Sequence, residues 1–194
     1  MSLDPDWILI EKFYGGDLAA FHEIFFKYKV TVINFAFRVV KQRELAEDIA
    51  QEVFIKVYGK KAKPDDKAKF STWLYRVTVN ASLDHVRKKS FSFFSLDQKR
   101  ESDEGDEVSV LEGIAGDKEA SPRKALEERE TKALLQKEIE HLPEKLRIPL
   151  LLFEYEQKSY RETAQILGTS EKAVERRIYR AKEELRQKLS KSFK

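Results

Sequence analysis

The chain has 194 residues, of which 41% are hydrophobic and 37% are charged, and its formal net charge is +3. It contains no cysteine, which excludes disulfides, thiolate metal sites and thiol catalysis, so a cytoplasmic protein is the simplest expectation. The apolar runs are far shorter than the roughly 18 residues that a membrane span needs, and Asp4 and Asp6 follow Met1 where a targeting segment would be basic, so we expect neither.

Residues 1–92 carry apolar side chains at helical spacings of three and four, and no stretch there indicates a strand. Four helices are therefore expected, at about 5–14, 18–39, 43–58 and 72–89. Asp4, Asp17 and Ser71 are the expected N-caps of the first, second and fourth helices, and glycines end the first and third. This part of the chain therefore predicts a helical bundle.

One face of the expected fourth helix carries aromatic, amide and basic side chains. Trp73, Asn80 and Arg87 fall on that face, two lysines follow, and the loop 59–69 before the helix adds five more. Basic groups hold phosphates, aromatic rings stack on unpaired bases, and an amide can read a base edge. The face is thus a candidate site for single-stranded DNA, although Trp73 alone is more simply a core residue.

Charge is unevenly distributed along the chain. Residues 1–90 hold 16 Lys and Arg against 12 Asp and Glu, residues 91–122 hold 3 against 9, and residues 123–194 hold 18 against 13. The acidic segment 93–121 mixes Ser, Gly and acids with little helical period, which is typical of a flexible linker. A solvated spacer is its simplest interpretation; an acidic strip that mimics nucleic acid in a basic channel is the alternative.

Residues 122–194 predict a second helical domain, which ends in a helix-turn-helix. Ser159 and Glu162 form a capping box that opens a short helix, and Gly168 fits the left-handed position that ends it. Ser170 is the expected cap of the longer second helix. The residues expected to hold these two helices together are Ala164, Val174 and Ile178.

The exposed side of that last helix is expected to meet duplex DNA. Its charged residues are Lys172, Glu175, Arg176, Arg177 and Arg180. Arginine can bond O6 and N7 of guanine or the phosphates, and Glu175 can accept from N4 of cytosine. Residues 170–194 hold 9 basic against 4 acidic groups, whereas residues 123–169 hold 9 of each, which favours DNA binding over a generic solvated helix.

Four segments together resemble the signature segments of the extracytoplasmic-function group of bacterial RNA polymerase sigma factors. They are AEDIAQEVFIKVY, KFSTWLYRVTVNASLDHVRKK, HLPEKLRIPLLLF and SYRETAQILGTSEKAVERRIYRAKEEL. The match covers about residues 7–89 and 123–190, in the family's order. The resemblance implies an all-α fold of two helical domains, with residues 1–92 as sigma region 2, residues 93–121 as the acidic linker and residues 122–194 as sigma region 4.

The resemblance also implies which residues meet polymerase and promoter DNA. The residues implied to dock on the coiled coil of the largest polymerase subunit are Asp48, Gln51 and Glu52. The simpler alternative is that they form a solvent-facing acidic edge of the helix. Those implied to capture the single-stranded −10 element, with one base flipped into a pocket near the aromatic and the amide, are Lys61, Lys63, Phe70, Asn80, Arg87 and Lys88. Those implied to read the duplex −35 element are Ser170, Lys172, Glu175, Arg176, Arg177 and Arg180.

The expected partners are bacterial core RNA polymerase, promoter DNA and, as is common in the family, an anti-sigma factor. We expect no cofactor, no metal and no enzyme activity, because the three histidines lack ligand spacing and no phosphate loop or paired-acid motif is present. Two other functions stay open. A stand-alone helix-turn-helix regulator would explain the second domain, and a non-specific single-stranded DNA binder would explain the first.

Overall fold

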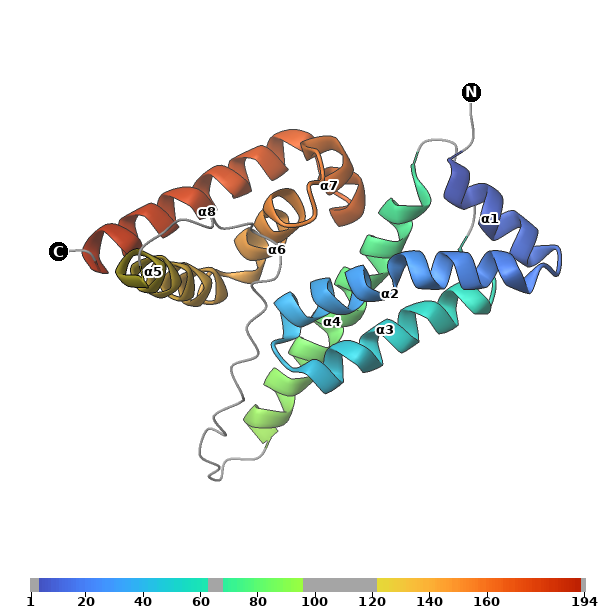
Figure 1. Cartoon of the computed structure of the whole chain (residues 1–194), viewed down its shortest axis with the longest axis horizontal. Helices are drawn as coiled ribbons and strands as arrows, with labels where there is room; N and C mark the ends of the chain where they lie inside the picture. Colours follow the sequence, from blue (N-terminus) through green and yellow to red (C-terminus); the bar gives the residue numbers. More distant parts are fainter. Residues whose placement is uncertain (1–3, 63–67, 96–121, 193–194) are drawn as a thin grey trace.

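The structure is a computed structural model that describes residues 4–62, 68–95 and 122–192, with side chains described for 4–62, 68–88 and 129–190. Within these ranges the chain forms eight helices and no strand, which confirms the all-α class (Figure 1). None of the helices in this part of the chain is long and apolar enough to cross a bilayer.

The helices follow the order that the sequence predicts. They are α1 (Pro5–Tyr14), α2 (Leu18–Val40), α3 (Arg43–Tyr58), α4 (Phe70–Ser95), α5 (Pro122–Glu140), α6 (Glu144–Glu154), α7 (Tyr160–Leu167) and α8 (Glu171–Ser192). Helix α4 continues past residue 92, the expected end of the first domain. The predictions that concern Lys63 and linker residues 96–121 lie outside the described residues.

Helices α1–α4 pack around one apolar core. In Figure 1, α2 and α3 run side by side, and α4 contacts both. The core includes Trp7, Ile10, Ile24, Ile49, Val53, Phe70 and Leu74, all nearly inaccessible to solvent. Burying a side chain of this size contributes about 1.5–3 kcal/mol. The inner side of α4 is therefore firmly held, and its outer side is left for other contacts.

The start of α4 differs from the sequence-based prediction. Ser71 is not its N-cap, because the helix begins at Phe70. The amide of Phe70 donates to Oδ2 of Asp4 at 2.7 Å. The indole of Trp7 donates to the Ala68 carbonyl at 2.8 Å. Asp4, at the N-cap position of α1, makes no side-chain cap bond there, so Asp4 and Trp7 of α1 together fix where α4 begins.

The C-terminal helices confirm the predicted helix-turn-helix. Ser159 and Glu162 form the capping box of α7, with both reciprocal bonds present. Gly168 ends α7 in the left-handed conformation at φ 61°, which a residue without Cβ adopts at little cost. The hydroxyl of Ser170 accepts from the amide of Ala173 in the first turn of α8. The residues expected to hold α7 and α8 together are all buried: Ala164, Val174 and Ile178.

The two domains pack against each other through a shared apolar cluster. The first domain contributes Phe35, Val39, Tyr75 and Val79, which are buried together with core residues of α6–α8. Helix α7 contacts α4, and in Figure 1 it lies on the side of the second domain that faces α4. The sequence, interpreted as two modules joined by a linker, does not predict this contact.

Candidate nucleic-acid interface

The outer face of α4 carries the polar stripe that the sequence predicts. Asn80, Arg87 and Lys88 are exposed, and Trp73 at the other end is partly buried against the bundle core. The residues that face inward from the same helix include Leu74, Thr78 and Ala81, all buried. Helical geometry therefore separates an apolar inner side from an outer side that offers an amide and two cations to a ligand.

Phe70 does not belong to that outer face, and its contact with a flipped base stays a prediction. Its side chain is 0% exposed. It packs edge-to-face against Trp7 with ring centroids 5.2 Å apart, and it stacks on Trp73 at 5.9 Å. Asn80 lies ten positions further along α4, about 15 Å at 1.5 Å per residue. The structure therefore does not bring Phe70 and Asn80 into one pocket.

The loop before α4 presents one predicted cation and uses another for packing. Lys61 is exposed at the end of α3. Lys60, next to it, donates from Nζ to the Tyr14 carbonyl at 2.8 Å and lies 5.7 Å from the centre of the Tyr14 ring. Of the two, Lys61 is therefore the better placed to meet phosphate.

Helix α3 exposes a mixed acidic and apolar face. Asp48 and Gln51 are exposed as predicted. The sequence reasoning missed that Ile55 is 69% exposed and Tyr58 is 58% exposed on the same side of α3. The signal was available, because these residues follow Asp48 by seven and ten positions and so fall on one helical face. Two large exposed apolar side chains beside an acid and an amide are typical of a surface that meets another protein.

Glu52 lies one turn after Asp48 on the same side of α3, but its carboxylate is paired. Its carboxylate accepts from Nζ of Lys56 at 2.7 Å and lies 3.7 Å from Nε2 of His85 on α4. The hydrogen bond from Lys56 lowers the pKa of Glu52 below its usual value. The Glu52 carboxylate therefore interacts with one residue of α3 and one of α4, and it is not an unpaired acid beside Asp48.

The outward side of α8 carries most of the predicted duplex-binding residues. Those found exposed are Ser170, Lys172, Glu175, Arg176 and Arg180. Arg177 is the exception: it is partly buried, because Val174 and Ala181 at three and four positions away both face the core. Arg177 therefore lies at the flank of the exposed side, and its contact with DNA stays a prediction.

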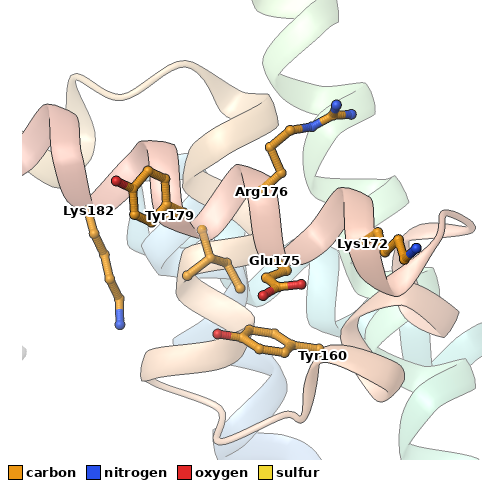
Figure 2. A pocket seen from close by; sticks show the side chains of 7 residues that line it. Tyr160, Lys172, Glu175, Arg176, Tyr179 and Lys182 are labelled. Carbon is orange, nitrogen blue, oxygen red and sulfur yellow. The ribbon is translucent and has the colours of Figure 1, made fainter.

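A pocket of about 340 Å³ lies between the start of α7 and α8. Its lining residues are Tyr160, Lys172, Glu175, Arg176, Ile178, Tyr179 and Lys182. Figure 2 shows the Glu175 carboxylate directed toward the Tyr160 ring, whereas Arg176 extends from the opposite side of α8. Tyr179 is 66% exposed and follows Arg176 by three positions, so it shares the outward face. Sequence reasoning, which considered charge alone on this helix, missed Tyr160 and Tyr179.

No three His, Asp or Glu side chains within the described residues are grouped as metal ligands would be. The described surface offers the Asn80 amide and cations on α4, cations and the exposed Tyr179 ring on α8, and an acidic and apolar face on α3. Such groups bind phosphates, bases and other proteins.

The chain is similar to known proteins over nearly its whole length. The family description "Sigma-70 region 2" matches residues 24–91, and "Sigma-70, region 4" matches residues 132–185. The ECF RNA polymerase sigma factor SigW of Bacillus subtilis is 34% identical over 180 residues, covering 93% of this chain and 94% of that protein.

Two solved structures share the fold. CnrH in complex with the cytosolic domain of CnrY superposes with a TM-score of 0.67 at 22% identity, covering 96% of this chain and 98% of that one. The sigma factor RpoE in complex with the anti-sigma factor NepR from Bartonella quintana gives a TM-score of 0.63 at 19% identity, covering 88% and 96%. These two likenesses establish a common arrangement of helices.

Proposed function

The chain belongs to the extracytoplasmic-function group of the sigma-70 family of RNA polymerase sigma factors, and we propose that it meets promoter DNA and polymerase through three exposed helix faces. As a sigma factor it directs promoter recognition and transcription initiation. Sigma factors are generally not enzymes. We infer that this one has no catalytic activity of its own and acts in the cytoplasm by binding promoter DNA more tightly in its opened form than as a duplex.

The outer face of α4 is proposed to capture the single-stranded −10 element. The observation that carries the proposal is the exposure of Asn80, Arg87 and Lys88 along one side of a helix whose opposite side is core. Flipping a base out of a duplex costs a few kcal/mol. Stacking of one captured base on the protein returns about 1–3 kcal/mol, which is of the same size. Lys61 and Lys63 are proposed to add phosphate contacts, whereas Phe70 supports the site from beneath.

Helix α8 is proposed to read the duplex −35 element. Arg176 and Arg180 lie on its outward side together with Tyr179, and Ser170 and Lys172 stand at its first turn, where recognition helices contact base edges. Arginine suits guanine and phosphate, and an aromatic ring can contact a thymine methyl group. Glu175 also remains proposed as a base contact, at the edge nearest α7, and Arg177 is proposed to contact the backbone from its flank.

The exposed face of α3 is proposed to dock on core polymerase. Asp48 and Gln51 supply polar contacts, and Ile55 and Tyr58 supply apolar area that water would otherwise cover. Aromatic residues with apolar neighbours commonly provide the central contacts of an interface. Glu52 is proposed to act there only indirectly, through its bonds to α3 and α4.

The domain boundaries and the remaining partner are also proposals. Residues 1–92 are proposed as the polymerase and −10 domain, residues 93–121 as a linker that runs toward the RNA exit channel, and residues 122–194 as the −35 domain. Because the RpoE sigma factor with the same fold was solved bound to an anti-sigma factor, we infer that an anti-sigma protein is a partner of this chain as well.

The proposal is tested by forming a complex of the purified chain with bacterial core RNA polymerase and measuring co-elution by size exclusion. Asp48→Arg should abolish co-elution, because it places a cation in the centre of the proposed α3 contact. Glu11→Arg, an exposed charge reversal on α1, serves as the matched control and should co-elute normally. Failure of the unaltered chain to bind polymerase would overturn the proposed docking.

A further inference from the structure

The contact between the two domains is centred on a buried acid. Glu156, between α6 and α7, has a side chain that is only 8% exposed. Its carboxylate accepts from Nη1 of Arg38 on α2 at 3.2 Å and from the hydroxyl of Tyr75 on α4 at 2.5 Å. The Arg38 guanidinium also lies 4.8 Å from the centre of the Tyr155 ring. Two helices of the first domain thus hold one loop of the second.

Around Glu156 the contact between the domains is shielded from water, and its charged groups have partners of complementary charge or an aromatic ring. The ammonium of Lys158 lies 4.6 Å from the centre of the Tyr75 ring. Burial and the neighbouring Glu156 carboxylate raise the pKa of Tyr75, so its phenol remains a donor at neutral pH. Lys41, which follows α2, adds an ion pair with Glu140 of α5 at 2.6 Å. Neutralising Glu156 would leave the largely buried Arg38 guanidinium without its counter-ion, so it should favour separation of the domains.

The edge of this contact uses two cations that border the proposed −10 face. Nζ of Lys69 lies 2.9 Å from Oε1 of Glu162, and Nη2 of Arg76 donates to the Gln165 carbonyl at 2.5 Å. Arg76 precedes Asn80 by four positions, one turn of α4, and Lys69 immediately precedes the helix. Both cations are exposed, and both engage acceptors of α7. Lys69 and Arg76, two cations suited to binding phosphate, are therefore bonded to an acid and a carbonyl of the second domain.

We propose that Lys69 and Arg76 are phosphate ligands of the −10 site that exchange partners. In the closed chain they bind Glu162 and the Gln165 carbonyl of α7, and in the open chain they bind the backbone of single-stranded DNA. Docking of the helix-turn-helix domain on α4 and binding of single-stranded DNA to α4 then compete. The inference rests on the proposed assignment of the −10 face and deepens it.

Competition has a measurable consequence for affinity. Only the open fraction of the chain binds the strand, so the apparent affinity falls in proportion to that fraction. If roughly 80 to 90% of the chain is closed, opening it fully tightens binding about five- to tenfold. Polymerase or duplex DNA that holds the two domains apart would supply the same gain in the working complex.

The first test measures the distance between the domains in the full chain. Because the sequence has no cysteine, a spin-label pair can be placed at Glu23→Cys on α2 and Lys145→Cys on α6, both exposed. The unaltered contact should give one short distance by pulsed electron paramagnetic resonance, and Glu156→Gln should give longer, broader distances. Arg38→Gln should do the same from the other domain, which separates opening from misfolding of the helix-turn-helix. Arg186→Gln, at an exposed ion pair within α8, is the control that should change nothing.

The second test measures binding of a short fluorescein-labelled single-stranded DNA of mixed sequence, by anisotropy at low salt. Glu156→Gln should bind about five- to tenfold more tightly than the unaltered chain. Adding Lys69→Ala or Arg76→Ala to that variant should remove the gain. Adding Lys145→Ala, which removes an exposed cation outside the contact, should keep it.

Three results would overturn the exchange. The unaltered chain could already show the broad distances of Glu156→Gln, the opened variant could bind the strand no more tightly, or the gain could survive loss of both Lys69 and Arg76. None of these bears on polymerase docking, which the Asp48→Arg co-elution tests separately. Failure of the exchange and failure of the proposed function are therefore distinguishable.

Discussion

Helices α4 and α8 are both proposed to contact DNA, but their starting points are fixed in different ways. The start of α8 is local: Gly168 ends the preceding helix and the Ser170 hydroxyl accepts from the Ala173 amide. The start of α4 is fixed by residues more than sixty positions away in sequence, Asp4 just before α1 and Trp7 within it. A DNA-binding helix can thus be placed by its own sequence or by the fold around it.

The two helices also differ in what covers them. The outward side of α8 is exposed from Lys172 to Arg180. The outward stripe of α4 is exposed as well, but the flank beside it is buried against the second domain through Tyr75 and Val79. The position of α4 therefore depends on α1, and access to its flank depends on the other domain.

The largest effect is expected at Trp7, which supports α4 from a distance. Trp7→Ala removes a side chain that is 2% exposed, its bond to the Ala68 carbonyl and its contact with Phe70. Such a truncation should lower the free energy of unfolding by about 3–5 kcal/mol. Denaturant unfolding followed by circular dichroism measures it. Tyr179→Ala, at an exposed ring on α8, should stay within about 0.5 kcal/mol, and equal losses for the two variants would erase the difference between the helices.

The bond from the Phe70 amide to Asp4 should matter next. Asp4→Ala leaves a buried amide without its acceptor, which we expect to cost about 1–3 kcal/mol. Asp4→Asn retains an acceptor oxygen and should lose less. The same unfolding measurement checks both variants. No loss for Asp4→Ala would mean that α4 begins without help from α1.

The local start of α8 should respond more weakly. Ser170→Ala removes the cap and should cost about 1 kcal/mol, whereas Ser170→Gly should cost only a few tenths. Hydrogen exchange of the α8 amides can locate the loss. It should be confined to the first turns of α8, and a loss that spread to α4 would contradict a locally specified start.

The smallest effect is expected at Glu162 of α7, whose carboxylate pairs with Lys69 just before α4. Partial burial raises the pKa of this carboxylate, but bonds from Lys69 and Ser159 outweigh it and lower the pKa to about 2. Because the folded pKa lies below the ordinary value, the stabilisation is present above about pH 4.5 and is lost as the pH falls toward 2. Glu162→Gln should flatten that part of the stability profile, measured by denaturant unfolding between these values. An unchanged slope would contradict the assignment.

Local signals explain what the sequence predicted well. Helical periodicity, the Ser159–Glu162 capping box and Gly168 act within a few residues, so the helices and the helix-turn-helix could be predicted. Ser71 failed as a cap because a distant carboxylate, that of Asp4, satisfied the Phe70 amide first.

The remaining misses depend on tertiary packing. Phe70 is an aromatic residue beside a basic loop, and only the position of Trp7 shows that it is core. The Glu156 contact joins residues more than eighty positions apart, so no spacing along the chain could indicate it. Ile55, by contrast, was predictable from its position on the α3 face.

The central claim is that α4 and α8 each read their own promoter element. The most direct measurement combines permanganate reactivity of unpaired thymines with a protection footprint, on promoter complexes of core polymerase with the chain. Asn80→Ala should lose reactivity at the −10 element and keep the upstream footprint. Arg176→Ala should weaken the upstream footprint, with a cost of about 1–3 kcal/mol in binding, and melt the −10 element normally once bound. If Asn80→Ala kept full reactivity, or if each variant lost both signals equally, the division of reading between the two helices would be contradicted.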